Sequence, residues 1–244
     1  AAAGTLARRG VLVRRLEAFE ALASVDTVMF DKTGTLTHDA MVLGSTQVRA
    51  GVPVERVLAM AAALAQHSLH PVSRALVVAA GGSAISTEWK ADAVAEVAGQ
   101  GVSGRVWHGD APLTVTRLRL GSASFCGLEL SGSLSLQVCV SDEQGWLATF
   151  ELHEDVRADA AATVAALQQG GIAVHLLSGD SLSAAARVAA RVGIAEFQGG
   201  CSPQDKLDFL RSSQRRGRRV AVVGDGLNDG TVLAGAHASF AFGQ

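Results

Sequence analysis

Residues 31–37 read DKTGTLT, directly after the apolar run Val28-Met29-Phe30, which predicts a buried strand. Asp31 is therefore offered at the carboxyl end of a strand, where open α/β sheets place their ligand sites. A phosphatase built this way needs a second acid two residues later, to protonate the leaving group and to activate water. The chain has Thr33 there. A nucleophile without that partner can accept a phosphoryl group and hold it, so we expect this heptad to store a phosphoryl group between steps.

The composition indicates a packed chain and excludes several classes of function. Its 244 residues suffice for one large domain or two modest ones. Apolar residues make up 48% and charged residues 18%, which argues against disorder. A net charge of −2 and an aromatic content of 5% give no basis for binding nucleic acid. Cys126, Cys139 and Cys201 form no CxxC pair, as expected of reduced thiols in a cytosolic compartment.

Targeting and membrane signals are absent from the sequence. No apolar run approaches the ~18–20 residues that span a bilayer, and no signal peptide is visible. Residues 1–23 form a basic, amphipathic stretch that fits either a solvated helix or a juxtamembrane linker on the cytoplasmic side. We therefore expect a soluble chain that can be part of a protein with membrane domains.

The order of predicted elements indicates an α/β domain split by an insertion. A strand at 25–30 belongs with the later part of the chain, where strands at 172–177, 220–223 and 238–242 alternate with helices at 156–169, 181–192, 206–215 and 229–236. Such alternation predicts a doubly wound parallel sheet formed by residues 24–39 and 151–244. Residues 40–150 predict an inserted α+β domain: helices at 54–66 and 72–80, and an antiparallel sheet with strands at 42–48, 93–98, 102–107, 113–120, 134–140 and 146–152.

Three later segments place polar groups at the same sheet edge as Asp31. They are SGD at 178–180, the Pro203–Lys206 segment, and GDGLND at 224–229. Phosphoryl transfer spreads negative charge over the equatorial oxygens, so a site needs cations and donors there. Ser178 and the N–H groups of the following helix can donate hydrogen bonds to phosphate oxygens, and Lys206 can neutralise the charge of one such oxygen.

The same edge offers oxygen ligands for Mg²⁺, which prefers them in near-octahedral geometry and keeps several waters. Asp31, the Thr33 carbonyl and Asp225 supply a minimal set. Each segment alone is weak evidence, because a Ser-Gly-Asp is usually a turn or a cap. Their combination, in this order and each at a strand end, predicts a phosphoryl-transfer site.

Together these motifs resemble those of the P-type ATPases, which have the haloacid dehalogenase-like superfold, and the resemblance covers essentially the whole chain. It implies that Asp31 is phosphorylated by ATP, and that Asp31, Thr33 and Asp225 hold Mg²⁺. It also implies a phosphate-binding role for Ser178, Gly179 and Lys206. The catalytic set then comprises Asp31, Lys32, Thr33, Ser178, Gly179, Asp180, Lys206, Asn228 and Asp229, with the last two matching the family's hinge-side pair.

The inserted region resembles the nucleotide-binding domain of the heavy-metal members of that family. QHSLHP at 66–71 resembles their SEHP signature, and GQGVSG at 99–104 resembles their GxG turn. The resemblance implies a nucleotide site at His70, Pro71, Gly99, Gly101 and Gly121. Leu69 stands where the usual residue is Glu, which removes one hydrogen-bond acceptor for the adenine amino group. We expect weaker nucleotide binding for that reason.

Within the heavy-metal group, residues 229–239 are similar to copper-transporting members linked to respiratory oxidase assembly, in Gly230 and in His237-Ala238-Ser239. The resemblance thus implies a part of a copper(I) pump, with ATP and Mg²⁺ as cofactors. The transported ion would be handled by membrane domains, and the actuator domain would be a partner. A zinc, cadmium or lead pump is the alternative within the family.

Three other interpretations remain open at this point. A free-standing phosphatase of the same superfold is disfavoured by Thr33, and a catalytically silent nucleotide-binding module is the second. The third is a metal site at His67 and His70, whose spacing could put both side chains on one helix face. Pro71 follows at once, and no Cys or carboxylate joins the two histidines.

Overall fold

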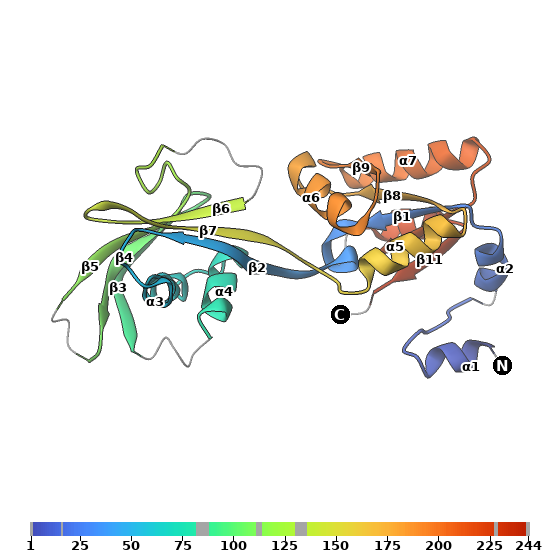
Figure 1. The fold of residues 1–244 in the computed structure, drawn as a ribbon. Coiled ribbons are helices and arrows are strands. Elements are labelled where there is room, and N and C mark those ends of the chain that lie inside the picture. The colour runs from blue at the N-terminus through green and yellow to red at the C-terminus, as the bar shows by residue number, and fades with distance from the viewer. Residues whose placement is uncertain are drawn as a thin grey trace. The chain divides into compact units, whose positions relative to one another are not determined.

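The computed structural model describes residues 2–15, 17–81, 88–110, 114–129, 136–226 and 229–242. The chain divides into two compact units, here called unit 1 (Ala1–Asp39 and Val156–Gln244) and unit 2 (Ala40–Asp155). Each unit has its own sheet (Figure 1). Each also has its own buried apolar side chains. The predicted fold, a doubly wound parallel sheet interrupted by an α+β insertion with an antiparallel sheet, is confirmed.

Unit 1 is built on a five-stranded parallel sheet. Its strand order is β11 (Ala238–Ala241), β10 (Val220–Gly224), β1 (Thr27–Asp31), β8 (Ala173–Leu177) and β9 (Glu196–Gln198). The central strand β1 is buried along residues 27–30, as its uninterrupted apolar run requires when helices cover both faces. All five strands point their carboxyl ends to the same edge, which is the edge that presents Asp31.

Two pairs of helices cover the two faces of this sheet. Helices α5 (Ala160–Gln169) and α6 (Leu182–Val192) pack on one face over a core that contains Phe30, Val164 and Val188. Helices α7 (Pro203–Arg215) and α8 (Gly230–Gly235) cover the other face, over Met29, Leu210 and Val232. The short helices α1 (Ala2–Ala7) and α2 (Glu17–Ala23) precede the sheet. No helix among the described residues is long and apolar enough to cross a membrane.

Local sequence signals fix the starts of the two helices that reach the catalytic edge. The Ser181 hydroxyl accepts a hydrogen bond from the Ala184 N–H at the start of α6. At α7, Ser202 and Asp205 form a capping box in which each side chain accepts from the other residue's backbone N–H, and Pro203 occupies the first turn. The capping box fixes where α7 begins and so sets the position of Lys206 in its first turn.

Unit 2 is a six-stranded sheet with helices on one face. The strand order is β2 (Thr37–Val48), β7 (Gly145–Val156), β6 (Leu136–Asp142), β5 (Thr116–Gly121), β4 (Gly101–His108) and β3 (Trp89–Val97), and the pairs from β3 to β7 run antiparallel. Helices α3 (Val54–Ala65) and α4 (Pro71–Ala79) pack together, and α3 lies against β3, β4 and β5. Their shared core contains Leu64, Leu76, Val106 and Phe150.

Several predicted boundaries were wrong. The helix predicted at 156–169 begins only at Ala160, because β7 continues to Val156 and the Arg157 N–H then donates to the Leu36 carbonyl. The short strand β9 was not predicted, since three residues carry no periodic signal. The stretch 1–23 forms two short helices separated by an irregular segment. The starts of the strands predicted at 113 and 134 lie outside the described residues.

Two glycines let strands β4 and β5 approach closely. Gly101 and Gly121 lie directly opposite each other in the antiparallel pairing. A Cβ on Gly121 would fall 2.2 Å from the Gln100 carbonyl oxygen, and one on Gly101 would fall 2.4 Å from the Leu120 carbonyl oxygen. Both clashes are with backbone, so no side-chain rotation relieves them. Gly101, the second glycine of the GxG turn, and Gly121 are therefore required by the sheet itself.

We predict that Gly121→Ala destabilises unit 2 by about 3 kcal/mol, at the upper end of the usual cost of overpacking, because backbone must shift. Trp89, Trp107 and Trp146 all lie in unit 2, so tryptophan fluorescence during urea unfolding reports on this unit. Val78→Ala is the control, since that side chain is 74% exposed, and its effect stays within about 0.5 kcal/mol. Equal midpoints for the Gly121→Ala variant and the wild type would contradict this account of the β4–β5 contact.

Candidate active site

The pairing register brings the predicted catalytic segments of unit 1 together. Asp31 ends β1 and lies opposite Leu177, the last residue of β8, so Ser178 follows directly beside it. On the other side of β1, Phe30 pairs with Val223 of β10, so the GDGLND segment begins at the same level. The carboxyl edge of the sheet thus gathers residues that are nearly 200 positions apart in sequence.

A buried ammonium group joins two carboxylates at the centre of this edge. Lys206 Nζ lies 2.6 Å from Asp31 Oδ1 and 2.9 Å from Asp229 Oδ1. The side chains of Lys206, Asp31 and Asp229 are only 10%, 12% and 4% exposed. Asp229, which the sequence comparison matched to a hinge-side pair, therefore contacts the cation of the catalytic edge. Its predicted companion Asn228 lies outside the described residues.

Burial and pairing act in opposite directions on these groups. Burial raises the pKa of Asp31 above its ordinary value, although the hydrogen bond from Lys206 partly offsets this. Burial alone would lower the pKa of Lys206, but hydrogen bonds to Asp229 and Asp31 outweigh it and raise that pKa. One ammonium shared by two carboxylates is thus held protonated. With both carboxylates ionised, the trio carries one excess negative charge, which favours an added cation.

A second ion pair closes the loop that follows Asp31. Lys32 is buried, and its Nζ lies 2.7 Å from Asp180 Oδ2. The Thr33 hydroxyl donates to the same carboxylate oxygen at 3.3 Å. Burial alone would raise the pKa of Asp180, but the hydrogen bond from Lys32, the charge of Lys32 and the hydrogen bond from Thr33 together lower that pKa. Asp180 therefore acts in this structure as an anionic anchor for the 32–36 loop.

Ser178 is positioned by the loop that leads into α7. Its side chain is 1% exposed, and its hydroxyl accepts from the Asp180 N–H at 3.1 Å. Its own N–H donates to the Gln198 carbonyl, and its carbonyl accepts from the Cys201 N–H. A Cβ on the adjacent Gly179 would sit 3.5 Å from the Cys201 carbonyl oxygen, an ordinary contact. The SGD triplet is therefore held by backbone bonds on both sides.

Arg157 also shapes the catalytic loop, and sequence reasoning missed it. Its guanidinium donates to the Thr35 carbonyl at 2.9 Å and to the Gly34 carbonyl at 3.2 Å. The guanidinium carbon lies 4.8 Å from the centroid of the Phe242 ring. Two donors in one planar fork match two successive carbonyls, which a lysine could not do. The single signal in the sequence was an arginine a few residues after the last predicted strand of the inserted domain, at 146–152.

The oxygen donors at this edge fit Mg²⁺. Gly34 adopts φ +71°, and a Cβ there would lie 3.2 Å from Asp225 Cβ, so the loop lies directly against Asp225. The predicted ligands are two carboxylates, Asp31 and Asp225, and the Thr33 carbonyl; such hard oxygens, with waters, suit Mg²⁺. No group of three His, Cys, Asp or Glu side chains among the described residues is arranged to hold a metal ion. This is compatible with Mg²⁺, which protein sites often hold through one or two carboxylates.

Unit 2 contains all five residues predicted to bind the nucleotide. His70 is the N-cap of α4, where its Nδ1 accepts from the Val72 N–H at 3.3 Å, and Pro71 follows in the first turn. The Ser68 hydroxyl donates to Glu96 Oε1 at 2.6 Å, which ties this loop to the β3–β4 hairpin that carries Gly99 and Gly101. Leu69 is 89% exposed. Among the described residues, no third His, Cys, Asp or Glu joins His67 and His70 in a group that could hold a metal ion.

We predict that Lys206→Met lowers the stability of unit 1 by about 3–5 kcal/mol, because it leaves two buried carboxylates without their cation. Adding Asp31→Asn to that variant recovers part of the loss, since one of the unpaired charges is removed. Hydrogen exchange of the β1 and β10 amides measures both effects, and the β4 amides of unit 2 serve as an internal control. Further destabilisation by Asp31→Asn in the Lys206→Met background would contradict the charge-based explanation.

Comparison with known proteins places this site in a family. The model of the haloacid dehalogenase-like hydrolases matches residues 25–237. The copper-exporting P-type ATPase of Mycobacterium leprae is 36% identical over 260 aligned residues, covering 100% of this chain and 31% of that protein. The nitrogen fixation protein FixI of Rhizobium leguminosarum is 37% identical, covering 98% of this chain and 30% of that protein. The chain thus spans about a third of the length of these relatives.

Solved structures of heavy-metal P-type ATPases are also similar to this chain. A zinc-transporting PIB-type ATPase in the E2.Pi state superposes with a TM-score of 0.82 and 28% identity, covering 96% of this chain and 39% of that one. The catalytic domain of the CPx-ATPase CopB-B superposes with a TM-score of 0.67 and covers 98% of this chain and 87% of that one. At 23% identity, the second comparison shows the fold alone.

Proposed function

The chain belongs to the haloacid dehalogenase-like hydrolases, and from that premise we propose that it is the ATP-binding and phosphorylation unit of a heavy-metal cation pump. The observation that carries the proposal is the Asp31–Lys206–Asp229 contact at the carboxyl edge of the sheet, next to a loop with no acid at residue 33. The proposal is also supported by the alignment of this chain, along its full length, with a copper-exporting P-type ATPase.

In the proposed reaction, an Asp31 carboxylate oxygen attacks the γ-phosphorus of ATP in line with the bond to the β-phosphate. The new O–P bond forms as the old one breaks, and ADP leaves with its β-phosphate oxygen. Lys206 neutralises charge on the transferred group, and the Ser178 hydroxyl donates to one of its oxygens. Bound Mg²⁺ would supply further charge neutralisation at the phosphate oxygens, held by Asp31, the Thr33 carbonyl and Asp225.

The aspartyl phosphate then persists, because residue 33 offers no general base to activate water. A rapid phosphatase of the same superfold is disfavoured by this residue. In unit 2, His70 contacts the adenine, and the tight turn of Gly99 and Gly101, with Gly121, lets the backbone approach the nucleotide. Asp180 and Lys32 keep the catalytic loop in place.

We predict that the chain incubated with Mg²⁺ and γ-labelled ATP acquires a phosphate that survives acid and is released by hydroxylamine, as acyl phosphates are. Asp31→Asn abolishes the label, because an amide cannot attack. Asp208→Asn, an exposed carboxylate on α7, retains it. Label that remains on the Asp31→Asn variant would refute the assignment of the nucleophile, and rapid turnover of small phosphomonoesters would favour the phosphatase alternative.

We predict that Leu69→Glu tightens ATP binding by about 1–2 kcal/mol, the value of one restored hydrogen bond to the adenine amino group. Calorimetric titration of ATP against both proteins measures the difference. Leu69→Ala is the control, and it leaves the affinity unchanged because the leucine side chain is almost fully exposed. If Leu69→Glu binds ATP no more tightly than the wild type, this interpretation is wrong.

We further propose copper(I) as the transported ion and a membrane pump with an actuator domain as the full protein. The similarity to a copper-exporting P-type ATPase supports copper, and the solved zinc-transporting ATPase supports the alternative. ATP hydrolysis by membranes that carry the full-length protein distinguishes the two: we expect stimulation by Cu(I). Stimulation by Zn²⁺ alone would overturn the copper assignment.

A further inference from the structure

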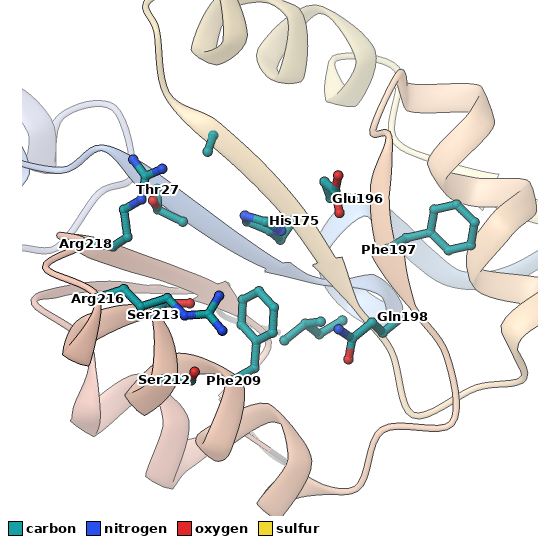
Figure 2. A pocket seen from close by; sticks show the side chains of 12 residues that line it. Thr27, His175, Glu196, Phe197, Gln198, Phe209, Ser212, Ser213, Arg216 and Arg218 are labelled. Carbon is teal, nitrogen blue, oxygen red and sulfur yellow. The ribbon is translucent and has the colours of Figure 1, made fainter.

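Unit 1 contains a polar cavity under one face of its sheet, and one end of that cavity reaches Leu177 at the catalytic edge. It has a volume of about 500 Å³ and lies between α7 and the strands β1, β8 and β9 (Figure 2). This size falls in the range of small-molecule sites. Its lining runs from the amino ends of the strands, at Thr27 and Ala173, to Leu177. None of its residues belongs to the predicted catalytic set, although the Gln198 backbone carbonyl accepts a hydrogen bond from the Ser178 N–H.

The cavity exists because this side of the sheet is incompletely covered. Helix α7 packs on β10 and α8, whereas α6 packs on β9 from the opposite face. The faces of β8 and β9 that look toward α7 therefore carry polar side chains, His175, Glu196 and Gln198. Figure 2 shows these side chains on the strand side and Phe209, Ser213 and Arg216 on the helix side.

Positive charge concentrates at one end of the cavity. Arg216 and Arg218 both line it, from the turn that follows α7, and Ser212 and Ser213 add two hydroxyls. Within the described part of the chain, neither guanidinium has an ion-pair partner. Two unpaired arginines on a chain with a net charge of −2 indicate a local anion preference that the overall charge does not predict.

His175 lies between this positive end and the opposite wall. Its ring makes an edge contact with Phe209, with centroids 5.1 Å apart. Burial lowers the pKa of His175; Arg218 acts in the same direction, and Glu196 acts against both. The lowered pKa favours the neutral imidazole, and a hydrogen bond from it can orient a ligand whose charge is met by the arginines.

We propose that this cavity binds a phosphate ester of a small polar molecule, with the phosphate between Arg216 and Arg218 and within reach of His175. Arginine forks match phosphate oxygens in two-pronged hydrogen bonds. Glu196 at the other wall repels a second negative charge, so the rest of the ligand is neutral or cationic and faces Glu196 and Gln198. The phosphate belongs either to a free metabolite or to a lipid headgroup, since both present the same group.

The test follows the His175 ring by NMR while inorganic phosphate is added, with the resonance assigned through His175→Gln. We expect a saturable shift in the wild type and at least about a tenfold weaker response in Arg216→Gln/Arg218→Gln, because two charge-assisted contacts are lost. Arg211→Gln/Arg215→Gln is the matched control: it removes the same charge from α7 without touching the cavity. No shift in the wild type, or equal weakening in both double variants, would overturn the proposal.

Vesicle sedimentation separates the two sources of the phosphate. A lipid headgroup is supported if the wild type binds phosphatidylglycerol vesicles but not phosphatidylcholine vesicles. That binding should be lost in Arg216→Gln/Arg218→Gln and kept in the control double variant. A phosphate-induced shift at His175 without such vesicle binding supports a free metabolite. Phosphorylation of Asp31 by ATP should be unchanged in Arg216→Gln/Arg218→Gln, so a failure of this proposal is distinguishable from a failure of the catalytic one.

Discussion

The catalytic edge of unit 1 depends on one buried cation. The Lys206 ammonium lies within hydrogen-bonding distance of both Asp31 and Asp229, which come from opposite ends of the chain. Two carboxylates as buried as these would repel each other strongly without it. The hydrogen bond from Lys206 lowers the pKa of Asp31, the proposed nucleophile, although burial raises that pKa by more. With both carboxylates ionised, the three groups carry one excess negative charge that a divalent cation can meet. Under the proposed mechanism, stability and chemistry depend on the same three side chains.

The surrounding structure fixes that cation in place by ordinary means. A capping box of Ser202 and Asp205 sets the first turn of α7, and with it the position of Lys206. Parallel pairing of β1 with β8 and β10 brings Asp31 level with the SGD and GDGLND segments. The loop between Asp31 and β2 is then held from two sides, by Asp180 and by the Arg157 fork. Most of these contacts are hydrogen bonds to backbone, which fix atomic positions more firmly than exposed ion pairs.

Sequence reasoning reached the architecture because the DKTGTLT, SGD and GDGLND motifs each followed a predicted strand. A buried run before Asp31, and strands before Ser178 and Gly224, imply one edge in a parallel sheet. It could not find Arg157 or the Lys32–Asp180 pair, because partners more than 120 residues apart leave no local pattern. Gly101 and Gly121 were interpreted as nucleotide-binding residues, and only the strand register reveals that they also permit the β4–β5 approach. The cavity beside His175 arises from helix placement, which no motif records.

The central claim is that Asp31 is a phosphoryl acceptor served by Lys206, Ser178 and Asp225. A crystal structure of the chain grown with Mg²⁺ and beryllium fluoride, a mimic of a bound phosphoryl group, tests it most directly. We expect beryllium bonded to an Asp31 oxygen, fluorides contacted by Lys206 and the Ser178 hydroxyl, and Mg²⁺ held by Asp31, the Thr33 carbonyl and Asp225. Beryllium fluoride bound to another residue, or Mg²⁺ held without Asp225, would contradict it.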